Sequence, residues 1–504
     1  MLNFDISLEA DGATVDGVHV RRVAGREAIS EAFRFAVDLA CAASAGLPDS
    51  VHTGAEVSLV LRVNGAVVRR VHGLVSEFES GLETTGDYRT YTLTLVPRIH
   101  RLALVFSPSV YVGNTVSEIL DAELAKYALE PPSDGRSHDY EVQLLEPPTA
   151  RELTVQYGES AFAFLSRLTE SLGISFFFEH DERRDRVVFT DHGGRFRPCP
   201  GASVAPFDAT GSASGVHELR ETRRVVPRYY QVRDHNYRRQ APDVEGEYEL
   251  DVTDVAGGVV EHGSHAQTPE EARALAQIRA EEQRTRSVEY HGKSTLVGLT
   301  AGARTTLRDH AHLEPLQGFE LLVTEVTHEA VLPTPWDAAT VSSYSNRFVA
   351  IPGAVRFRPA QKTPRPRMPG VMTGVIQPGP SGEVGGVAQL DEHGRYRVMM
   401  HFDLEGSERP VCSPPVRMMQ PFVGQTHGVH LPLRRGTEVL IAFTNGDPDR
   451  PVILGAVPNV LAPSVVGATD SHLHRLRSPG GTVVEFGTTS HPSPPTQGTP
   501  ELRR

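Results

Sequence analysis

Short segments in which apolar and polar residues alternate, each closed by a turn rich in Gly, Pro, Asn or Asp, constrain the fold of this chain most strongly. They are densest at residues 385–459. After a polar loop at 391–394, four apolar residues recur with the two-residue period of a half-buried strand: Tyr396, Val398, Met400 and Phe402. Residues 436–443 and 451–457 predict further strands on either side of the turn at 445–450. This region therefore predicts a small antiparallel β-barrel.

Residues 1–105 show the same kind of pattern. Runs rich in β-branched and aromatic residues lie at 18–23, 33–39, 57–63 and 91–96. Asn64-Gly65 stands between two such runs, and this pair favours a two-residue hairpin. We expect one barrel here and a second in the strand-like, polar region from about 201 to 263, with strands resuming at 288–348.

Three helices interrupt the strands. Residues 115–128 and 160–172 carry apolar side chains at helical spacing, with Gly173 as a stop. Thr268-Pro-Glu-Glu271 opens the third helix, which runs to about Arg286, because it places an N-cap, a proline and a capping-box glutamate in order. That helix is heavily charged and has only a thin apolar stripe, so we expect it to lie on a surface with a solvated face.

The run Phe176-Phe-Phe178 lies in a predicted hairpin of residues 174–180 and 186–192. Three successive aromatic residues on an exposed edge would promote aggregation. We therefore expect a helix or a partner subunit to cover them.

The chain of 504 residues is too long for one core and predicts several domains. A Pro-rich linker at 362–370 separates a hub-like region at 1–361, with two β-barrels and helical insertions, from a barrel at 371–460. Residues 461–504 form the last segment, with a flexible tail. The fold class is thus mainly β with a few helices.

Composition excludes some functions. A formal net charge of −13 disfavours non-specific nucleic-acid binding. Cys41, Cys199 and Cys412 are odd in number and far apart, which predicts free thiols. The N-terminus has no basic and apolar leader, and no apolar run reaches the ~20 residues of a membrane helix. If the protein leaves the cell, a machine must carry it.

Four blocks of the barrel region occur in a specific order: Asp391-Glu-His-Gly-Arg395, Arg417-Met-Met-Gln-Pro421, Leu431-Pro-Leu-Arg-Arg-Gly-Thr-Glu-Val439 and Asn445-Gly-Asp-Pro-Asp-Arg-Pro-Val-Ile-Leu-Gly455. Together they resemble the OB-fold segment of the VgrG family, the trimeric spikes of type VI secretion systems, which are related to phage tail hubs. Residues 156–180 and 318–328 are similar to hub signatures of the same family. The resemblance implies structural roles for Asp391, Gly394, Arg395, Gln420, Pro421, Gly436, Gly446, Asp447, Pro448, Asp449, Arg450 and Pro451.

The resemblance also implies an assembly. A homotrimer with two hub barrels per chain would cap a hexameric tube of Hcp type. It would contact baseplate proteins, carry a PAAR-type tip protein or an effector, and cross a target membrane transiently. The protein would be cytoplasmic until assembled and then secreted into the medium or a target cell. Pro479, Gly480 and Gly481 would start a trimeric C-terminal β-helix, the family's needle.

The chain departs from the family at three places: Phe422, the pair His427-Gly428, and the needle, which is nearly missing. The short C-terminus is either natural or truncated. We expect it to leave no room for a large effector domain and to affect how a tip protein docks.

No sequence motif indicates catalysis or a cofactor. His217-Glu218 and His328-Glu329 lack the second histidine of a zincin motif and are expected on the surface. The pairs His310/His312 and His472/His474 are weak metal candidates without a third ligand. Of the neighbouring acids Glu438, Asp447 and Asp449, the two aspartates are interpreted as residues of a structural turn and not as a catalytic carboxylate pair. Two alternatives stay open: the hub and spike of a phage tail or extracellular injection particle, and a spike with lytic enzyme activity.

Overall fold

The computed structural model describes residues 4–81, 86–131, 138–210, 214–238, 244–252, 254–309, 319–378 and 384–487, and the backbone of residues 502–503. Two compact units make up the chain. The large unit contains Met1–Ser107, Thr115–Ala150 and Glu159–Arg365, and the small unit contains Pro108–Asn114, Arg151–Gly158 and Pro366–Arg504. Both are mainly β, as the sequence pattern predicts.

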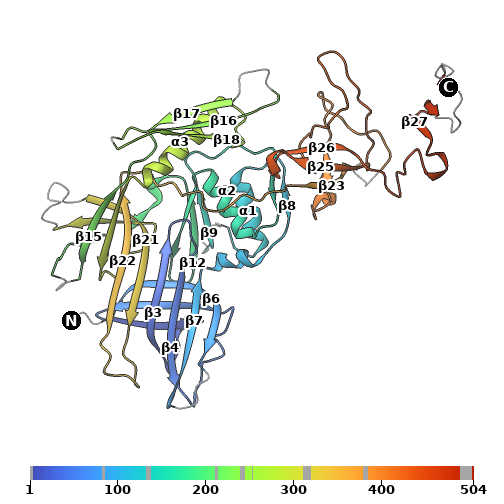
Figure 1. The fold of residues 1–504 in the computed structure, drawn as a ribbon. Coiled ribbons are helices and arrows are strands. Elements are labelled where there is room, and N and C mark those ends of the chain that lie inside the picture. Colours follow the sequence, from blue (N-terminus) through green and yellow to red (C-terminus); the bar gives the residue numbers. More distant parts are fainter. Residues whose placement is uncertain are drawn as a thin grey trace. The chain divides into compact units, whose positions relative to one another are not determined.

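A fourteen-stranded sheet, counted over the described residues, forms the body of the large unit (Figure 1). Its main path has the order β15-β19-β22-β21-β3-β4-β7-β6-β5-β1-β2, and β20 pairs with β21, β13 and β14. The strands of the first half are β1 (Phe4–Ala10), β2 (Ala13–Thr14), β3 (Val18–Ala28), β4 (Arg34–Ala42), β5 (Glu56–Val63), β6 (Ala66–Ser80) and β7 (Tyr88–Val96). Those of the second half are β13 (Arg197–Pro198), β14 (Val204–Pro206), β15 (Val216–Arg223), β19 (Val288–Ser294), β20 (Ala303–Arg308), β21 (Phe319–Val331) and β22 (Ser343–Pro352).

The antiparallel pairing of β21 with β3 joins the two halves, because it places residues about 300 positions apart in register, from Glu325 opposite Ala28 to Val331 opposite Arg22. The strands of the expected first barrel and those at 288–348 are thus hydrogen-bonded into one continuous sheet. Of the region from about 201 to 263, expected as a second barrel, β14 and β15 join this sheet, whereas the strands within residues 229–262 form a separate three-stranded sheet. The predicted hairpin between β5 and β6 is confirmed, since Asn64 and Gly65 both have positive φ, 53° and 81°.

The first two predicted helices are confirmed as α1 (Val116–Lys126) and α2 (Ala161–Ser171). Thr115 and Glu118 form a reciprocal capping box at the start of α1. The Ser160 hydroxyl accepts the Ala163 N–H at the start of α2, and Gly173 follows its end with a φ of +67°.

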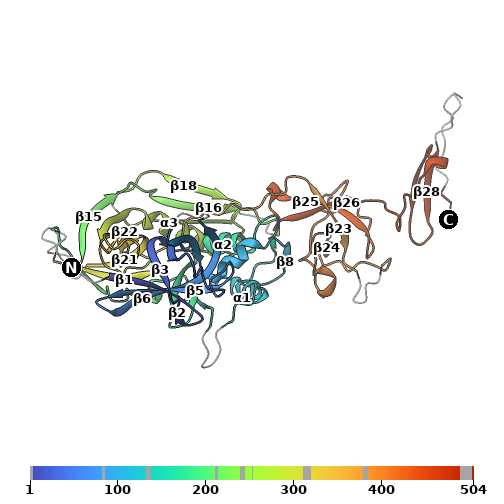
Figure 2. The same ribbon diagram turned by 90° about the horizontal axis from the view of Figure 1, so that it is seen from below.

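Helix α3 (Pro269–Thr285) begins at the predicted cap, where the Thr268 hydroxyl accepts the Glu271 N–H. The helix keeps an exposed face, as expected, with Glu270, Arg273 and Arg284 exposed, and its opposite face is buried. Its alanine stripe (Ala272, Ala276 and Ala280) packs against a three-stranded sheet of β16 (Tyr229–Asp234), β17 (Val244–Glu249) and β18 (Gly258–His262) (Figures 1 and 2). Alanine is small enough to bring the helix close to the strands, so a thin stripe suffices for burial.

The Phe176-Phe-Phe178 run lies on β11 (Ser175–His180), which pairs with β12 (Asp185–Thr190) beside β9 (Tyr140–Gln143). All three side chains are buried within one chain. Their rings meet aromatic rings of other large-unit segments: Phe176 meets Phe162 of α2 at 6.0 Å between centroids, Phe178 meets Phe33 at 5.0 Å, and Phe177 meets Phe196 at 5.1 Å. The predicted cover therefore includes a helix, and it needs no partner subunit.

The small unit is built on a four-stranded sheet in the order β24-β23-β25-β26. Its strands are β23 (Val371–Ile376), β24 (Val398–Met400), β25 (Glu438–Phe443) and β26 (Pro451–Ala456). The predicted alternation is confirmed, since Tyr396, Val398 and Met400 are buried and Phe402 is partly buried. Before the 391–394 loop, the described residues form one bridge, Val387 to Arg434.

Two short segments from early in the chain complete the core of the small unit. Strand β8 (Ser109–Tyr111) pairs antiparallel with β10 (Thr154–Gln156). Val110, Leu153 and Val155 are buried together with residues of β25 and β26. The C-terminal segment adds the sheet β27 (Leu473–Arg477), β28 (Val483–Gly487) and β29 (Leu502–Arg503).

The three cysteines are buried and free. Over the part of the chain that the structure describes, no helix is both long enough and apolar enough to span a membrane.

The aromatic run generates the first prediction. Replacing Phe176, Phe177 and Phe178 together by Ser should prevent the large unit from folding. Truncating one buried Phe costs about 3–5 kcal/mol, and three such losses approach the ~5–15 kcal/mol of a whole domain. Circular dichroism and urea unfolding would measure the loss. Phe106→Ser is the control, because Phe106 is exposed. A triple variant with an unchanged unfolding transition would contradict the assignment.

Candidate assembly surfaces

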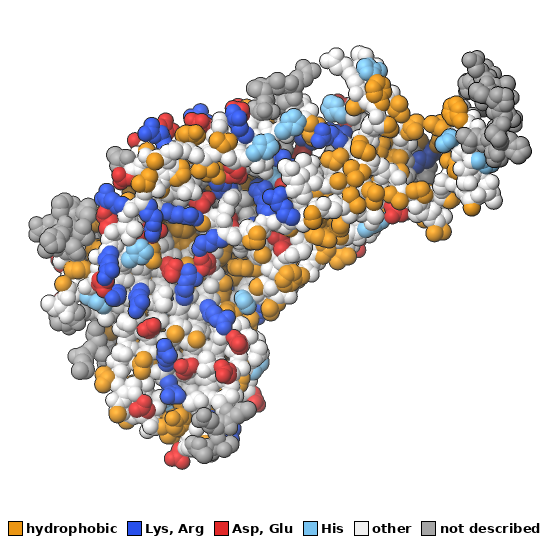
Figure 3. Space-filling model, viewed as in Figure 1, with side chains coloured by type: hydrophobic (Ala, Val, Ile, Leu, Met, Phe, Trp, Pro, Cys, Tyr) orange, Lys and Arg blue, Asp and Glu red, His pale blue; other side chains and the backbone are white. Residues whose placement is uncertain are grey.

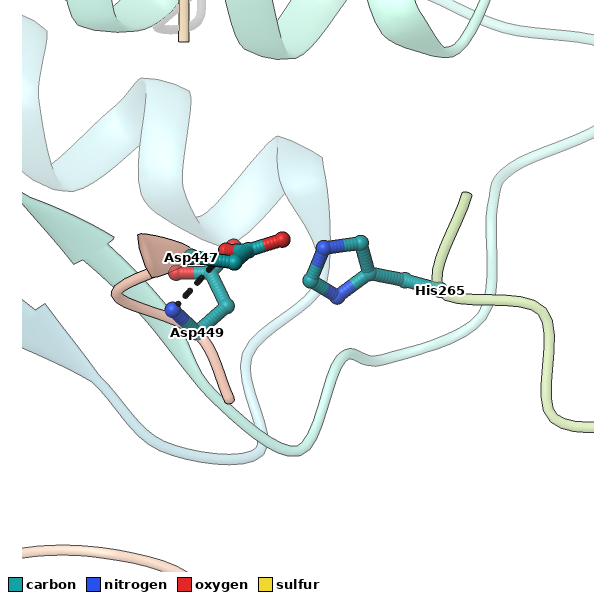
Figure 4. Close-up of side chains that lie close together, drawn as sticks. All are labelled: His265, Asp447 and Asp449. Carbon is teal, nitrogen blue, oxygen red and sulfur yellow. Dashed lines mark hydrogen bonds between the residues drawn. The ribbon is translucent and has the colours of Figure 1, made fainter. Parts of the chain in front are cut away.

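The turn at 444–450 connects β25 to β26. We call the residues whose structural role the family resemblance implies the signature residues, and five of them lie in this turn: Gly446, Asp447, Pro448, Asp449 and Arg450. Asn445 and Gly446 have positive φ, 57° and 71°. The Asp447 carboxylate accepts the Asp449 N–H at 3.1 Å (Figure 4), and the Asp447 carbonyl accepts the Arg450 N–H at 2.9 Å. The third side chain drawn in Figure 4, His265, belongs to the large unit. Within the small unit, the two aspartates act on backbone groups.

The same turn holds two other segments of the small unit. Asp449 Oδ1 accepts the Val155 N–H of β10 at 2.7 Å. The Gly446 carbonyl accepts the Met368 N–H at 2.8 Å, and Met368 is buried in the core. The turn therefore fixes both the end of the Pro-rich linker and a strand that lies some 290 residues away in sequence.

The Asp391 loop closes on its own side chain. Asp391 Oδ1 accepts the N–H groups of His393 and Arg395 at 3.0 and 2.9 Å, and Oδ2 accepts Arg395 Nε at 2.6 Å. Gly394 has a φ of +69°. Gly436 is required for a different reason: its φ is +78°, and a Cβ there would lie 2.5 Å from Val384. These signature residues shape loops of the barrel.

An arm of residues 419–431 contains the signature pair Gln420-Pro421. Its two sides are joined by hydrogen bonds from Val429 N–H to the Phe422 carbonyl (3.0 Å) and from Gly424 N–H to the His427 carbonyl (2.7 Å). Its large apolar side chains are exposed: Met419, Phe422, Val423, Val429 and Leu431. Figure 3 shows hydrophobic side chains gathered over the small unit.

The C-terminal hairpin of β27 and β28 turns at the expected needle start. Ser478 N–H donates to the Thr482 carbonyl at 2.8 Å, and Gly481 N–H donates to the Ser478 carbonyl at 3.0 Å, so Pro479, Gly480 and Gly481 lie in the turn. The register pairs Leu476 with Val484 and His474 with Phe486 on one face. On the other face, Arg475 binds Glu485 at 2.8 Å and Asp470 at 2.6 Å.

One face of this hairpin is therefore apolar and open, with Leu476 46% and Phe486 54% exposed, while the other is closed by ion pairs. A sheet this small, in which β29 adds only two paired residues to the hairpin, is marginally stable by itself. The link before it is also exposed and apolar at Val460 and Leu461.

The structure describes one of the two histidine pairs that were named as weak metal candidates, His472 and His474. His474 lies on the apolar face of the hairpin and His472 just before β27. Within the described residues, no cluster of three or more His, Cys, Asp or Glu side chains at metal-binding separations includes either of them. His310 and His312 lie outside the described residues.

The surface position expected for His328 is wrong. His328 is buried and lies between two partners: its Nε2 is 2.9 Å from Glu27 Oε1, and its Nδ1 is 2.7 Å from the Tyr344 hydroxyl. Arg69 Nη2 donates to Glu27 Oε2 at 2.6 Å, and its Nη1 donates to the Leu299 carbonyl at 3.1 Å. Sequence reasoning missed this cluster because its members come from β3, β6, β21 and β22.

The cluster perturbs the acid–base behaviour of its members. Burial alone would raise the pKa of Glu27, but the charge of Arg69 and hydrogen bonding from His328 together lower that pKa to about 2. His180 of β11 is a buried histidine outside these contacts, and its burial, assisted by the charge of Arg69, lowers its pKa to about 3. His180 Nδ1 accepts the His72 N–H at 3.1 Å, which a neutral imidazole can do.

Two protein-family models match different parts of this chain. Residues 26–333 match the family model of the phage tail baseplate hub (GPD), and residues 382–457 match that of the type VI secretion system and phage-baseplate injector OB domain. The spike protein VgrG5 of Pseudomonas aeruginosa is 31% identical over 461 residues, 86% of this chain and 55% of that protein. The actin cross-linking toxin VgrG1 of Vibrio cholerae is 29% identical over 478 residues, 90% of this chain and 42% of that protein.

The chain thus spans about half the length of these two relatives. Among solved structures, the E. coli c3393 protein, a component of the type VI secretion system similar to the T4 tail proteins gp27 and gp5, has a TM-score of 0.63 at 24% identity. The match covers 89% of this chain and 99% of that one. A chain of the PdpA–VgrG complex has a TM-score of 0.61 at 8% identity, covering 96% and 92%. Both establish a shared fold.

The turn at 444–450 generates the second prediction. Asp449→Ala should lower the free energy of unfolding of the small unit by about 1.5–3 kcal/mol, because it removes a charge-assisted hydrogen bond to Val155. Urea unfolding monitored on the small unit would measure the change. Glu392→Ala, an exposed acid in a neighbouring loop, should have almost no effect. Equal effects of the two variants would contradict the proposed role of Asp449.

The buried cluster generates the third prediction, which concerns pH. The pKa of His180 is lowered on folding, so the unfolded chain takes up a proton first as the pH falls below about 6.5, and stability is lost from there down to about pH 3. Glu27 adds a loss between about pH 4.5 and 2.

His180→Gln should therefore flatten the pH dependence of large-unit stability between pH 6 and 4. The expected difference in slope is about 1.4 kcal/mol per pH unit for one proton. The measurement is urea unfolding at a series of pH values, with the exposed His401→Gln as the control. Parallel curves for wild type and His180→Gln would show that His180 is not linked to folding.

Proposed function

The chain belongs to the phage tail baseplate hub family, and we propose that it acts as the structural spike of a type VI secretion machine. The observation that carries the proposal is the set of exposed apolar side chains on the small unit, above all the open face of the C-terminal hairpin. Such a face is stable when other chains cover it.

The occupant that fits is a second and a third copy of the same chain. In a cyclic trimer, each hairpin would cover the apolar face of the next, and the ring would close without forming a fibre. Strands shared between chains would also remove open edges. Each large unit supplies two sets of strands, so three copies would present six around the axis. This number matches a hexameric tube of Hcp type.

In this arrangement the trimer would sit between baseplate proteins and the tube, and the hairpins would form the start of a needle at 479–481. A PAAR-type tip protein or an effector would dock beyond them, and contraction would drive the assembly through a target membrane. The protein would leave the cell with the machine. The signature residues would serve the barrel that carries the needle, as their hydrogen bonds to backbone groups support.

A type VI machine is favoured over a phage tail by the curated relatives. Several spike proteins named VgrG align with 86–94% of this chain at 26–31% identity. The same hub and spike would still be compatible with a phage tail or an extracellular particle.

The assembly generates the fourth prediction. Size exclusion with light scattering should give a mass of about 165 kDa, three times the 55.0 kDa of one chain. Leu476→Ser with Phe486→Ser should shift the mass toward 55.0 kDa, because it removes the open apolar face.

Leu104→Ser with Phe106→Ser is the matched control, since it removes two apolar side chains that are even more exposed but lie on the large unit. A wild-type mass of 55.0 kDa would contradict a self-assembling trimer. Dissociation in the control alone would place the contact on the large unit instead.

A further inference from the structure

The two units of this chain are connected by more than the Pro-rich linker. The segments of the small unit are Pro108–Asn114, Arg151–Gly158 and Pro366–Arg504, so the chain passes between the units five times. Four of these passages flank the two short inserted segments. We name the pair formed by residues 108–114 and 151–158 the plug.

The plug is bound within the small unit by several kinds of contact. Its apolar residues Val110, Leu153 and Val155 are buried in the barrel core. Asp449 accepts the Val155 N–H, and Arg409 donates to the Val110 carbonyl. The two strands of the plug are paired along β8 and β10, and Gly113 N–H donates to the Glu152 carbonyl at 3.3 Å beyond them.

The linker is held differently. At its start, the Glu170 carboxylate accepts the N–H groups of Lys362 and Thr363 at 3.0 and 2.9 Å and the Thr363 hydroxyl at 2.9 Å, all within the large unit. At its end, the Met368 N–H binds the Gly446 carbonyl. Few residues therefore separate the two anchors, and the linker contributes no strand to the barrel.

We propose that the plug, and not the linker, is the principal attachment of the small unit to the rest of the chain. The barrel holds a two-stranded element of the small unit whose four ends continue into the large unit. A single cut in the linker then leaves the two parts bound through a buried core and backbone hydrogen bonds. Force on the small unit is shared between the linker and the plug. This inference goes beyond the spike proposal, because it concerns the attachment within one chain.

The test is a cleavable chain. A protease recognition sequence is inserted between Arg365 and Pro366 of the full chain, cleavage is verified under denaturing conditions, and the product is passed over a size-exclusion column with increasing urea. We expect the two fragments to elute together without urea and to separate only as the small unit unfolds. Fragments that separate without urea would overturn the proposal.

Two variants of the cleavable chain assign the contact. Leu153→Ala with Val155→Ala should make the fragments separate at a clearly lower urea concentration, and Asp449→Ala should produce a smaller shift in the same direction. Leu120→Ala with Leu124→Ala is the matched control, because it truncates two fully buried residues of α1 in the large unit. Separation of wild type and plug variants at the same urea concentration would overturn the proposal, as would an equal shift in the control. The plug variants distinguish attachment within one chain from contacts between chains, because they change the buried contacts of residues 151–158.

Discussion

The pairing of β21 with β3 is the interaction on which the large unit depends, because it makes one sheet from strands about 300 residues apart in sequence. Glu27, Arg69 and His328 lie at this junction and are buried. A buried ion pair adds little net stability over an apolar replacement, but leaving one partner alone is costly. We interpret the cluster as a device for specificity: the two halves can join only in the register that brings all three groups together.

Buried charges recur where elements of the large unit meet. Arg279 donates to the Ser171 carbonyl at 2.6 Å, and Arg358 donates to the Gly173 carbonyl at 2.9 Å, so two arginines satisfy carbonyls at the C-terminal end of α2. Arg98 binds both Asp139 and Asp185 beside the Phe-rich hairpin. These contacts orient the helices relative to the strands, whereas the small unit relies on a compact apolar core and the two aspartates of its turn.

Local patterns predicted local structure well, for identifiable physical reasons. Asn64-Gly65, the Thr115 and Thr268 caps and the alternation after Asp391 depend on residues within a few positions of each other, so the sequence contains the whole interaction. Predictions of exposure were less successful. His328 was expected on the surface, but it is buried and bound by Glu27, a residue about 300 positions away in sequence. The sequence shows that a charged or polar side chain prefers water, but it does not show whether a residue distant in sequence will replace that water as a hydrogen-bond partner.

The mainly β class, the helix positions, the turns and the resemblance to the family can be read from the amino acids alone, because these features depend on periodicity, capping and short ordered motifs. Three features became known only from the three-dimensional fold: the strands of the first expected barrel share one sheet with β19–β22, the Phe run is covered within one chain, and residues 108–114 and 151–158 belong to the small unit. The physical reason is that each of these outcomes depends on which apolar surfaces and backbone edges meet after the chain has turned back on itself. Many pairings satisfy the same local pattern, and packing selects among them.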